Sequence, residues 1–136
     1  SVLAKELADK GIEIISSETP FTEKADILFC GSKMGSIDHE VAENLSFSVL
    51  APTAALPITT RAVAVCKRRN ILALPDFITT AGPLISDKNQ ITETLSSIID
   101  EVMKHDEGPL IGACERAESF LSTWQSELPF GRPMAS

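Results

Sequence analysis

The sequence lacks the residues from which a complete catalytic centre is usually built. It has no tyrosine and only 5% aromatic residues. It contains neither a GxGxxG fingerprint nor a P-loop that would cradle a phosphate. No Ser-His-Asp set and no loop with paired carboxylates can be assembled from it. We therefore expect no catalytic residue within this chain.

The sequence also lacks a recognisable metal-binding motif. Its cysteines, Cys30, Cys66 and Cys114, are odd in number, far apart and without a CxxC pair. This favours free thiols in a reducing compartment over a disulfide framework or a zinc site. His39 lies between two acidic residues, but consecutive side chains point in different directions and no second histidine or cysteine follows one turn later. We expect no metal site, and we interpret His105 as structural.

Long apolar runs are absent as well. No stretch reaches the roughly 18 apolar residues that a membrane-spanning helix needs. The formal net charge of −7 argues against nucleic acid or an anionic membrane as a partner. The first residues, 1–11, form a charged amphipathic run and not a signal peptide, so we expect a cytoplasmic protein. They begin without methionine, which favours processing or a longer parent chain.

The sequence does contain short apolar runs that alternate with amphipathic stretches. We predict strands at residues 12–15, 25–30 and 47–51, and another in the apolar run that opens the segment Ile71–Ile85. We predict helices at residues 2–10, 38–44, 59–69, 89–105 and 110–128. Because strands and helices alternate with short connections, the pattern indicates an α/β fold with a parallel sheet.

Local signals support several of these helices. Asp38 can cap the second helix, and Thr59 or Thr60 can cap the third. Asn70 can take the left-handed turn that ends the third helix. The last helix carries an apolar stripe, in which Trp124 is expected to be a packing anchor. The stripe consists of Ile111, Cys114, Ala117, Phe120, Leu121 and Trp124.

Loops of small polar residues follow three of the predicted strands, at residues 31–36, 52–57 and 79–82. The carboxyl ends of parallel strands share one edge of a sheet, where ligands of open α/β folds bind. The loops should therefore converge, either as a ligand crevice or as ordinary connections, and the pattern is compatible with both. Cys30 lies at one of these ends, where we expect a small buried residue, because no basic neighbour would activate its thiol.

Three blocks of sequence at these strand ends carry a resemblance to a known family. They are KADILFCGSKMGSI (Lys24–Ile37), VLAPTAALPITTRA (Val49–Ala62) and NILALPDFITTAGPLI (Asn70–Ile85). They resemble, in order, the strand with its Gly-rich turn, the Glu-Gly-Ala-Asn-Gly-Pro-Thr-Thr loop, and the Pro-Asp-Phe-x-x-Asn-Ala-Gly-Gly stretch of the glutamate/leucine/phenylalanine/valine dehydrogenases. The resemblance covers residues 4–85, whereas the last two helices match only in pattern.

The resemblance implies a fold and a function. Residues 1–88 would be the second half of a Rossmann-like, three-layer α/β domain, and residues 89–136 two C-terminal helices packed on it within one domain. The family oxidatively deaminates amino acids and passes the hydride to NAD or NADP. The implied cofactor-binding residues are Cys30, Gly31, Ser32, Ala55, Thr80 and Gly82. The GxGxxG half and the catalytic domain would lie before Ser1, so this would be a fragment that is not active alone.

Several matching positions differ from the family. Ala55 and Thr80 stand where the family has asparagines that help to hold the nicotinamide and its ribose, and Pro83 replaces a glycine. Two hydrogen bonds lost at about 1 kcal/mol each would weaken cofactor binding without forbidding it. The alternative is therefore a non-catalytic relative that acts as a binding, regulatory or assembly module. An unrelated α/β domain with chance matches ranks last.

The implied partners follow from the same resemblance. The missing N-terminal part of the protein would cover the sheet edge that a half-domain exposes. On its own, the chain is expected either to bury this edge against a second copy, as a homo-oligomer, or to rearrange its strands, because an open apolar edge invites association.

Overall fold

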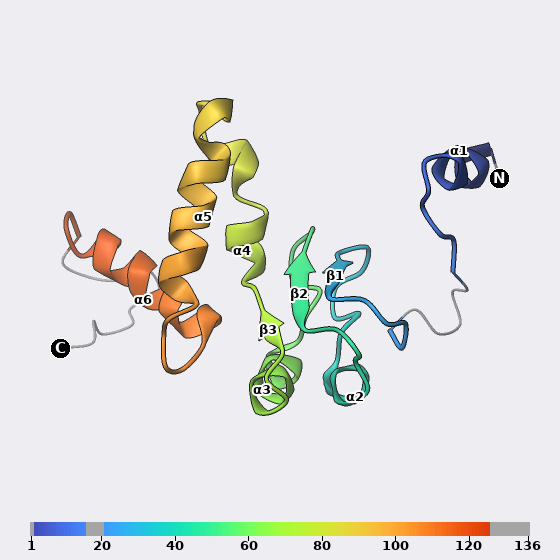
Figure 1. Ribbon diagram of the computed structural model, residues 1–136. Coiled ribbons are helices and arrows are strands. Elements are labelled where there is room, and N and C mark those ends of the chain that lie inside the picture. Colours follow the sequence, from blue (N-terminus) through green and yellow to red (C-terminus); the bar gives the residue numbers. More distant parts are fainter. Residues whose placement is uncertain (1, 16–20, 126–136) are drawn as a thin grey trace.

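A three-stranded parallel sheet lies at the centre of the computed structural model, which describes residues 2–15 and 21–125 (Figure 1). The strands are β1 (Ile27–Cys30), β2 (Val49–Pro52) and β3 (Leu72–Ala73), in the spatial order β1-β2-β3. β2 pairs with β1 along four residues and with β3 along two. The α/β fold with a short parallel sheet is therefore confirmed.

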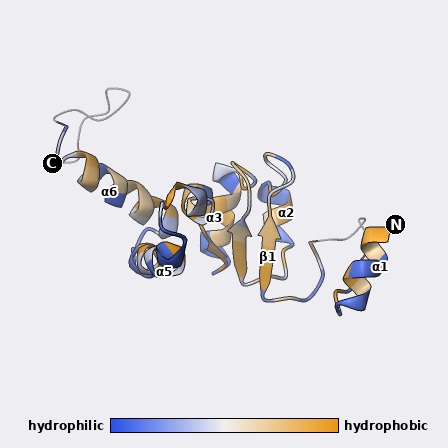
Figure 2. Cartoon of the chain, turned by 90° about the horizontal axis from the view of Figure 1, so that it is seen from above, coloured by the Kyte–Doolittle hydropathy of each residue, from blue (hydrophilic) through white to orange (hydrophobic). Residues whose placement is uncertain are grey.

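Two helices pack together on one face of the sheet (Figure 2), α2 (His39–Glu43) and α3 (Thr60–Arg68). The carboxylate of Asp38 accepts a hydrogen bond from the amide of Val41 at 2.9 Å, and the hydroxyl of Thr59 accepts one from Ala62 at 3.2 Å. Both expected caps are thus confirmed, with Thr59 rather than Thr60 at the second helix. Asn70 follows α3 with φ of 59°, the left-handed conformation expected for it.

The main hydrophobic core lies between the sheet and these two helices. Ile37, Leu50 and Cys66 are fully buried in it. The guanidinium of Arg69 donates hydrogen bonds to the carbonyl oxygens of Ala42 at 2.6 Å and Leu45 at 3.0 Å, and so joins the end of α3 to the end of α2. The helices are therefore fixed to each other by polar contacts at their ends as well as by apolar packing.

The predicted strand at residues 12–15 is wrong. This segment follows α1 (Val2–Asp9), the first of the expected helices, and forms no strand. Ile12, Ile14 and Ile15 are exposed, and α1 buries none of its residues and lies apart from the sheet (Figure 1). A strand forms only when a neighbour completes its hydrogen-bond ladder, and none of the described strands lies beside this segment.

The apolar run at Ile71 yields a shorter strand than its length indicates. β3 contains only two residues, because the chain turns into a helix at Asp76, the next residue whose N–H would continue the ladder after those of Leu72 and Leu74. A short helix, α4 (Asp76–Thr79), follows at once, and a turn of 3-10 helix covers Gly82–Leu84. The segment 79–82, expected as a loop, is therefore the end of one helical turn and the start of another.

Two longer helices complete the described chain, α5 (Ile91–Val102) and α6 (Pro109–Leu121). A turn of 3-10 helix at Lys88–Gln90 precedes α5. Both helices were expected, but each is shorter than predicted: α5 ends at Val102 instead of residue 105, and α6 ends at Leu121 instead of residue 128. Neither they nor any other described helix is long and apolar enough to cross a membrane. The division of the chain at residue 88 stays a prediction.

The prediction that Trp124 is a packing anchor of the last helix is wrong. Phe120 is 66% exposed and Trp124 is 63% exposed, and the two rings contact each other edge to face, with their centroids 6.5 Å apart. α6 instead faces α5 through Gly112 and Ala113, which are buried. A Cβ atom on Gly112 would lie 2.8 Å from the Cβ of His105, so the helices approach too closely for a larger residue. The apolar stripe therefore faces mostly away from the contact with α5.

The core position of Leu50 generates a test of this architecture. Leu50→Ala leaves a cavity in the main core, and we expect it to lower the free energy of unfolding by about 3 kcal/mol. Leu84→Ala is the matched control because Leu84 is 84% exposed, and its effect should stay within about 0.5 kcal/mol. Urea denaturation followed by circular dichroism measures both. Equal losses would contradict the assignment of the core.

Candidate functional site

The carboxyl ends of β1 and β2 are held together by hydrogen bonds and by close packing. The amide of Thr53 donates to the carbonyl oxygen of Cys30 at 2.7 Å, and its hydroxyl donates to the same oxygen at 3.3 Å. Gly31 lies so close that an added Cβ would be 2.3 Å from the Thr53 hydroxyl oxygen and 2.8 Å from the amide nitrogen of Ala54. Only glycine fits this position, so the two loops meet backbone to backbone.

The contact continues along both loops beyond the strands. The amide of Gly35 donates to the carbonyl oxygen of Leu56, and the amide of Ile37 donates to that of Pro57, each at 2.9 Å. The amide of Thr59 then returns a bond to the carbonyl oxygen of Ile37 at 3.0 Å. The loops after β1 and β2 therefore form one connected edge, as the parallel topology predicts.

The third strand end joins this edge through a side chain. One carboxylate oxygen of Asp76, at the start of α4, accepts a hydrogen bond from the amide of Leu56 at 2.6 Å. The other accepts one from the amide of Phe77 at 2.9 Å. Leu56 has φ of 54°, a left-handed conformation that is uncommon for a non-glycine residue. Neither Asp76 nor Leu56 was among the predicted site residues, and the signal for them is weak: an ordinary Pro-Asp helix start and a leucine before a proline.

The six predicted cofactor-binding residues fall into two groups. Cys30, Gly31, Ser32 and Ala55 lie on the two joined loops, with Cys30 buried and both Ser32 and Ala55 exposed. Thr80 and Gly82 lie on the third segment, beyond α4. Their cofactor-binding role stays a prediction.

On the third segment, residues 79–82, the side chain of Thr80 forms a hydrogen bond close to it in sequence. The hydroxyl of Thr80 donates to the carbonyl oxygen of Asp76 at 2.7 Å, within its own helical turn. A Cβ on Gly82 would lie 3.7 Å from a methyl carbon of Ile91 at the start of α5, an ordinary contact. The hydrogen bonds of Thr80 and Gly82 described here stay within residues 76–85. Asp76, rather than either of these residues, connects the segment to the other two strand ends.

The thiols of Cys30 and Cys66, which lie in the main core, are expected to be unreactive. Burial raises the pKa of the Cys30 thiol above its ordinary value, and burial also raises the pKa of the Cys66 thiol although the positive charge of Arg69 lowers it in part. Both thiols therefore stay protonated at neutral pH, which disfavours nucleophilic or metal-binding roles. Within residues 2–15 and 21–125, no group of three or more His, Cys, Asp and Glu side chains is placed to hold a metal ion.

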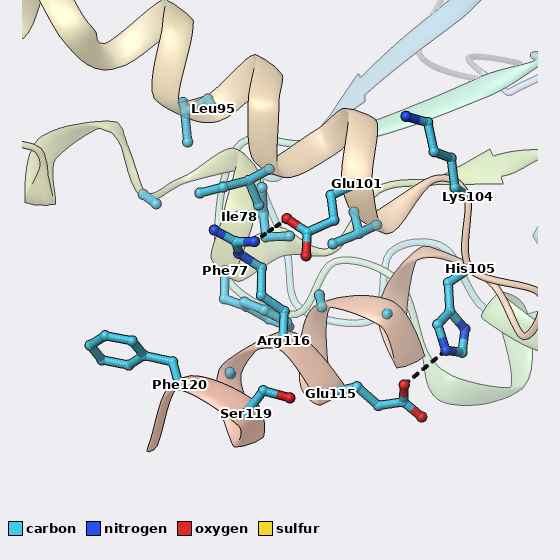
Figure 3. A pocket seen from close by; sticks show the side chains of 16 residues that line it. Phe77, Ile78, Leu95, Glu101, Lys104, His105, Glu115, Arg116, Ser119 and Phe120 are labelled. Carbon is cyan, nitrogen blue, oxygen red and sulfur yellow. Dashed lines mark hydrogen bonds and ion pairs between the residues drawn. The ribbon is translucent and has the colours of Figure 1, made fainter. Parts of the chain in front are cut away.

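A hollow that the sequence did not predict lies away from the strand ends (Figure 3). It is a cavity of about 920 Å³ between α4, α5 and α6, with Ile78, Val102 and Ala113 among its apolar lining. Two side-chain pairs border it: the ion pair of Arg116 with Glu101, and the hydrogen-bonded pair of His105 with Glu115 at 3.0 Å. The helical pattern predicted an apolar stripe on α6 but not which part of it would remain open.

Comparison with known protein families gives a match over most of the chain. The family model described as Glutamate/Leucine/Phenylalanine/Valine dehydrogenase matches residues 2–105. No curated protein matches.

Solved structures resemble the chain as well. The crystal structure of L-tryptophan dehydrogenase from Nostoc punctiforme superposes with a TM-score of 0.74 at 18% identity, covering 90% of this chain and 42% of that one. The leucine-bound hetero-hexameric glutamate dehydrogenase from Thermus thermophilus has a TM-score of 0.59 at 16% identity, covering 80% and 32%. At these identities the likeness shows the fold, and the chain spans less than half the length of either structure.

The close packing at Gly31 generates a prediction. Gly31→Ala places a methyl group against the backbone of the loop after β2, so we expect a loss of stability of about 2 kcal/mol. Gly82→Ala is the control, since its Cβ finds ordinary contact distance and a conformation open to any residue. Thermal unfolding of the two variants measures the difference. A Gly31→Ala protein as stable as the control would show that the loops do not meet here.

The thiols give a second prediction. At pH 8 a thiolate-specific reagent such as DTNB should modify Cys114 first, because Cys114 is partly exposed whereas Cys30 and Cys66 are buried. The two core thiols should react slowly in the folded chain, and faster as the pH rises toward their raised pKa values. In denaturant all three should react at once. Loss of the fast phase in Cys114→Ser identifies it, and a persisting fast phase would contradict the burial of the core thiols.

Proposed function

The chain belongs to the glutamate/leucine/phenylalanine/valine dehydrogenase family, and we propose that it forms the C-terminal half of the nucleotide-binding domain of an amino-acid dehydrogenase. Such an enzyme oxidatively deaminates an amino acid and transfers the hydride to NAD or NADP. The observation that carries the proposal is the joined edge of strand ends, on which Gly31 packs against the backbone at Thr53 and Ala54. This edge lies inside the matched region and at the place where open α/β sheets bind ligands.

The exposed backbone at this edge fits a dinucleotide. Among the described residues, the amides of Ser32 and Ala55 donate to no other group, and both residues are exposed. Unpaired N–H groups can donate to phosphate, ribose or carboxamide oxygens, and small side chains permit close approach. When bound, the nicotinamide cofactor supplies the hydride acceptor. This chain would contribute positioning, through the backbone of Ser32 and Ala55 and the residues that hold those loops.

The exposed apolar surfaces support a missing N-terminal part as the partner of this chain. Ile27 and Phe29 on β1 are 48% and 70% exposed, and residues 12–15 carry three exposed isoleucines. The outer edge of β1 pairs with no strand in the described part of the chain. A strand from the upstream half would pair with the open edge of β1, and elements of that half packed on the sheet would cover the exposed side chains. We further propose a cytoplasmic homo-oligomer for the complete protein.

A specific observation favours the alternative, a non-catalytic relative that serves as a binding, regulatory or assembly module. Ala55 has no side-chain hydrogen-bonding group, and the hydroxyl of Thr80 is engaged by its own helical turn at 2.7 Å. Neither side chain offers the amide that the family resemblance assigns to these positions. Cofactor affinity therefore separates the two functions.

The complete protein provides the test. We expect it to bind NAD or NADP and to reduce one of them with an amino acid as substrate, whereas the 136-residue chain alone should show no turnover. Ala55→Asn, which adds one side-chain hydrogen-bond partner, should tighten binding by about fivefold, equivalent to about 1 kcal/mol. Ala25→Asn, at an exposed position before β1, is the control. Calorimetric titration and absorbance at the reduced-nicotinamide band measure these outcomes. Failure to bind either cofactor would favour the non-catalytic module.

A further inference from the structure

We propose that Asp76 is a positioning residue, whose carboxylate holds the peptide between Ala55 and Leu56 in the orientation that presents the Ala55 carbonyl oxygen to a ligand. The ligand group would be a hydrogen-bond donor, a hydroxyl or an amide. The ligand part of this inference rests on the proposed function, whereas the structural part stands on the hydrogen bonds described above.

The backbone of Leu56 is the junction of all three strand ends. Its N–H donates to Asp76 at 2.6 Å, and its carbonyl oxygen accepts from the amide of Gly35 at 2.9 Å. The first bond reaches the segment after β3 and the second reaches the loop after β1. No other residue of the loop after β2 is described with bonds to both segments. The orientation of this one residue therefore sets the loop relative to both neighbours.

Leu56 holds this orientation against its own preference. Its φ of 54° places it in the left-handed region, which is unfavourable for a non-glycine residue and so has a conformational cost. Its side chain is 57% exposed, so packing offsets little of this cost. A hydrogen bond to a charged acceptor is stronger than one between neutral groups. The bond to Asp76 therefore helps to keep the left-handed conformation of Leu56 populated.

Asp76 itself is held firmly. The amide of Leu74 donates to the carbonyl oxygen of Leu50 in β2 at 3.0 Å, and Pro75, which is buried, has a restricted backbone. The carboxylate of Asp76 also accepts the amide of Phe77, which limits its rotation. A rigid acceptor therefore faces a strained loop, which is the arrangement expected when one residue positions another.

The hydrogen bond from Leu56 to Asp76 also sets the direction of the Ala55 carbonyl group. In a trans peptide the N–H and the C=O point in opposite directions, so directing the Leu56 N–H to Asp76 turns the Ala55 C=O away from Asp76. That oxygen accepts no hydrogen bond from the described residues, and Ala55 is exposed. A backbone acceptor thus stands at the position where the alanine has no side-chain acceptor to offer.

The structural part is tested by hydrogen exchange in the complete protein. Asp76→Ala should accelerate exchange of the peptide that covers residues 53–57 by about tenfold or more. Asp76→Asn keeps one acceptor oxygen and should restore most of the protection. Asp87→Ala is the matched control, because its carboxylate accepts a backbone amide at 2.9 Å from Asn89, away from the strand ends. Unchanged exchange of residues 53–57 in Asp76→Ala would overturn the inference.

The positioning role is tested by affinity for NAD and NADP. Asp76→Ala should raise the Kd of the bound cofactor about tenfold, and Asp87→Ala should leave it unchanged. Adding Leu56→Gly to Asp76→Ala should recover part of the affinity, because glycine takes the left-handed conformation without strain. An Asp76→Ala protein with accelerated exchange but unaltered Kd would overturn the ligand role. A wild-type protein that binds neither cofactor would instead refute the proposed function, and exchange alone would then decide the structural part.

Discussion

The strand-end edge depends on one constrained residue, Leu56. Its left-handed backbone lets a single residue donate to Asp76 and accept from Gly35, so that three segments distant in sequence share one junction. Close packing of Gly31 against Thr53 fixes the other end of the same loop. Because the loop is held at both ends by backbone groups, its path depends little on its own side chains. Small residues can therefore occupy it without loss of shape.

The parts of the fold that the sequence predicted are those determined by local chemistry. Asp38 and Thr59 cap helices because their side chains can accept backbone amides nearby, and Asn70 takes a left-handed turn that asparagine tolerates. The parallel sheet followed from the alternation of strands and helices. Leu56 could not be predicted in the same way, since leucine has no local preference for the left-handed region. Its conformation is imposed by contacts with residues 20 or more positions away.

The failed predictions share a different cause, which is dependence on a partner surface. The segment at residues 12–15 has the composition of a strand, yet a strand needs a neighbouring ladder. The stripe on α6 has the periodicity of a buried face, yet α6 contacts α5 through Gly112 and Ala113 and leaves Trp124 exposed. Periodicity identifies which side chains are apolar but not what covers them. Both surfaces are exposed in the described chain, which spans less than half the length of the two structural relatives.

At the candidate site the backbone is ordered, but the side chains differ from those to which the family resemblance assigns cofactor contacts. The resemblance to the family assigned cofactor contacts to side chains at positions 55 and 80, and in this chain neither side chain offers an amide. The backbone that surrounds position 55 is nevertheless fixed, since Asp76 constrains the following peptide and the amide and carbonyl of Ala55 remain unpaired among the described residues. A hydrogen bond from a fixed backbone group loses less conformational entropy than one from a mobile side chain. Loss of asparagine at position 55 therefore removes two polar groups but retains an ordered donor and acceptor. Under the proposal above, such a site would bind through these backbone groups, and its affinity would depend on Asp76 through the peptide that Asp76 holds.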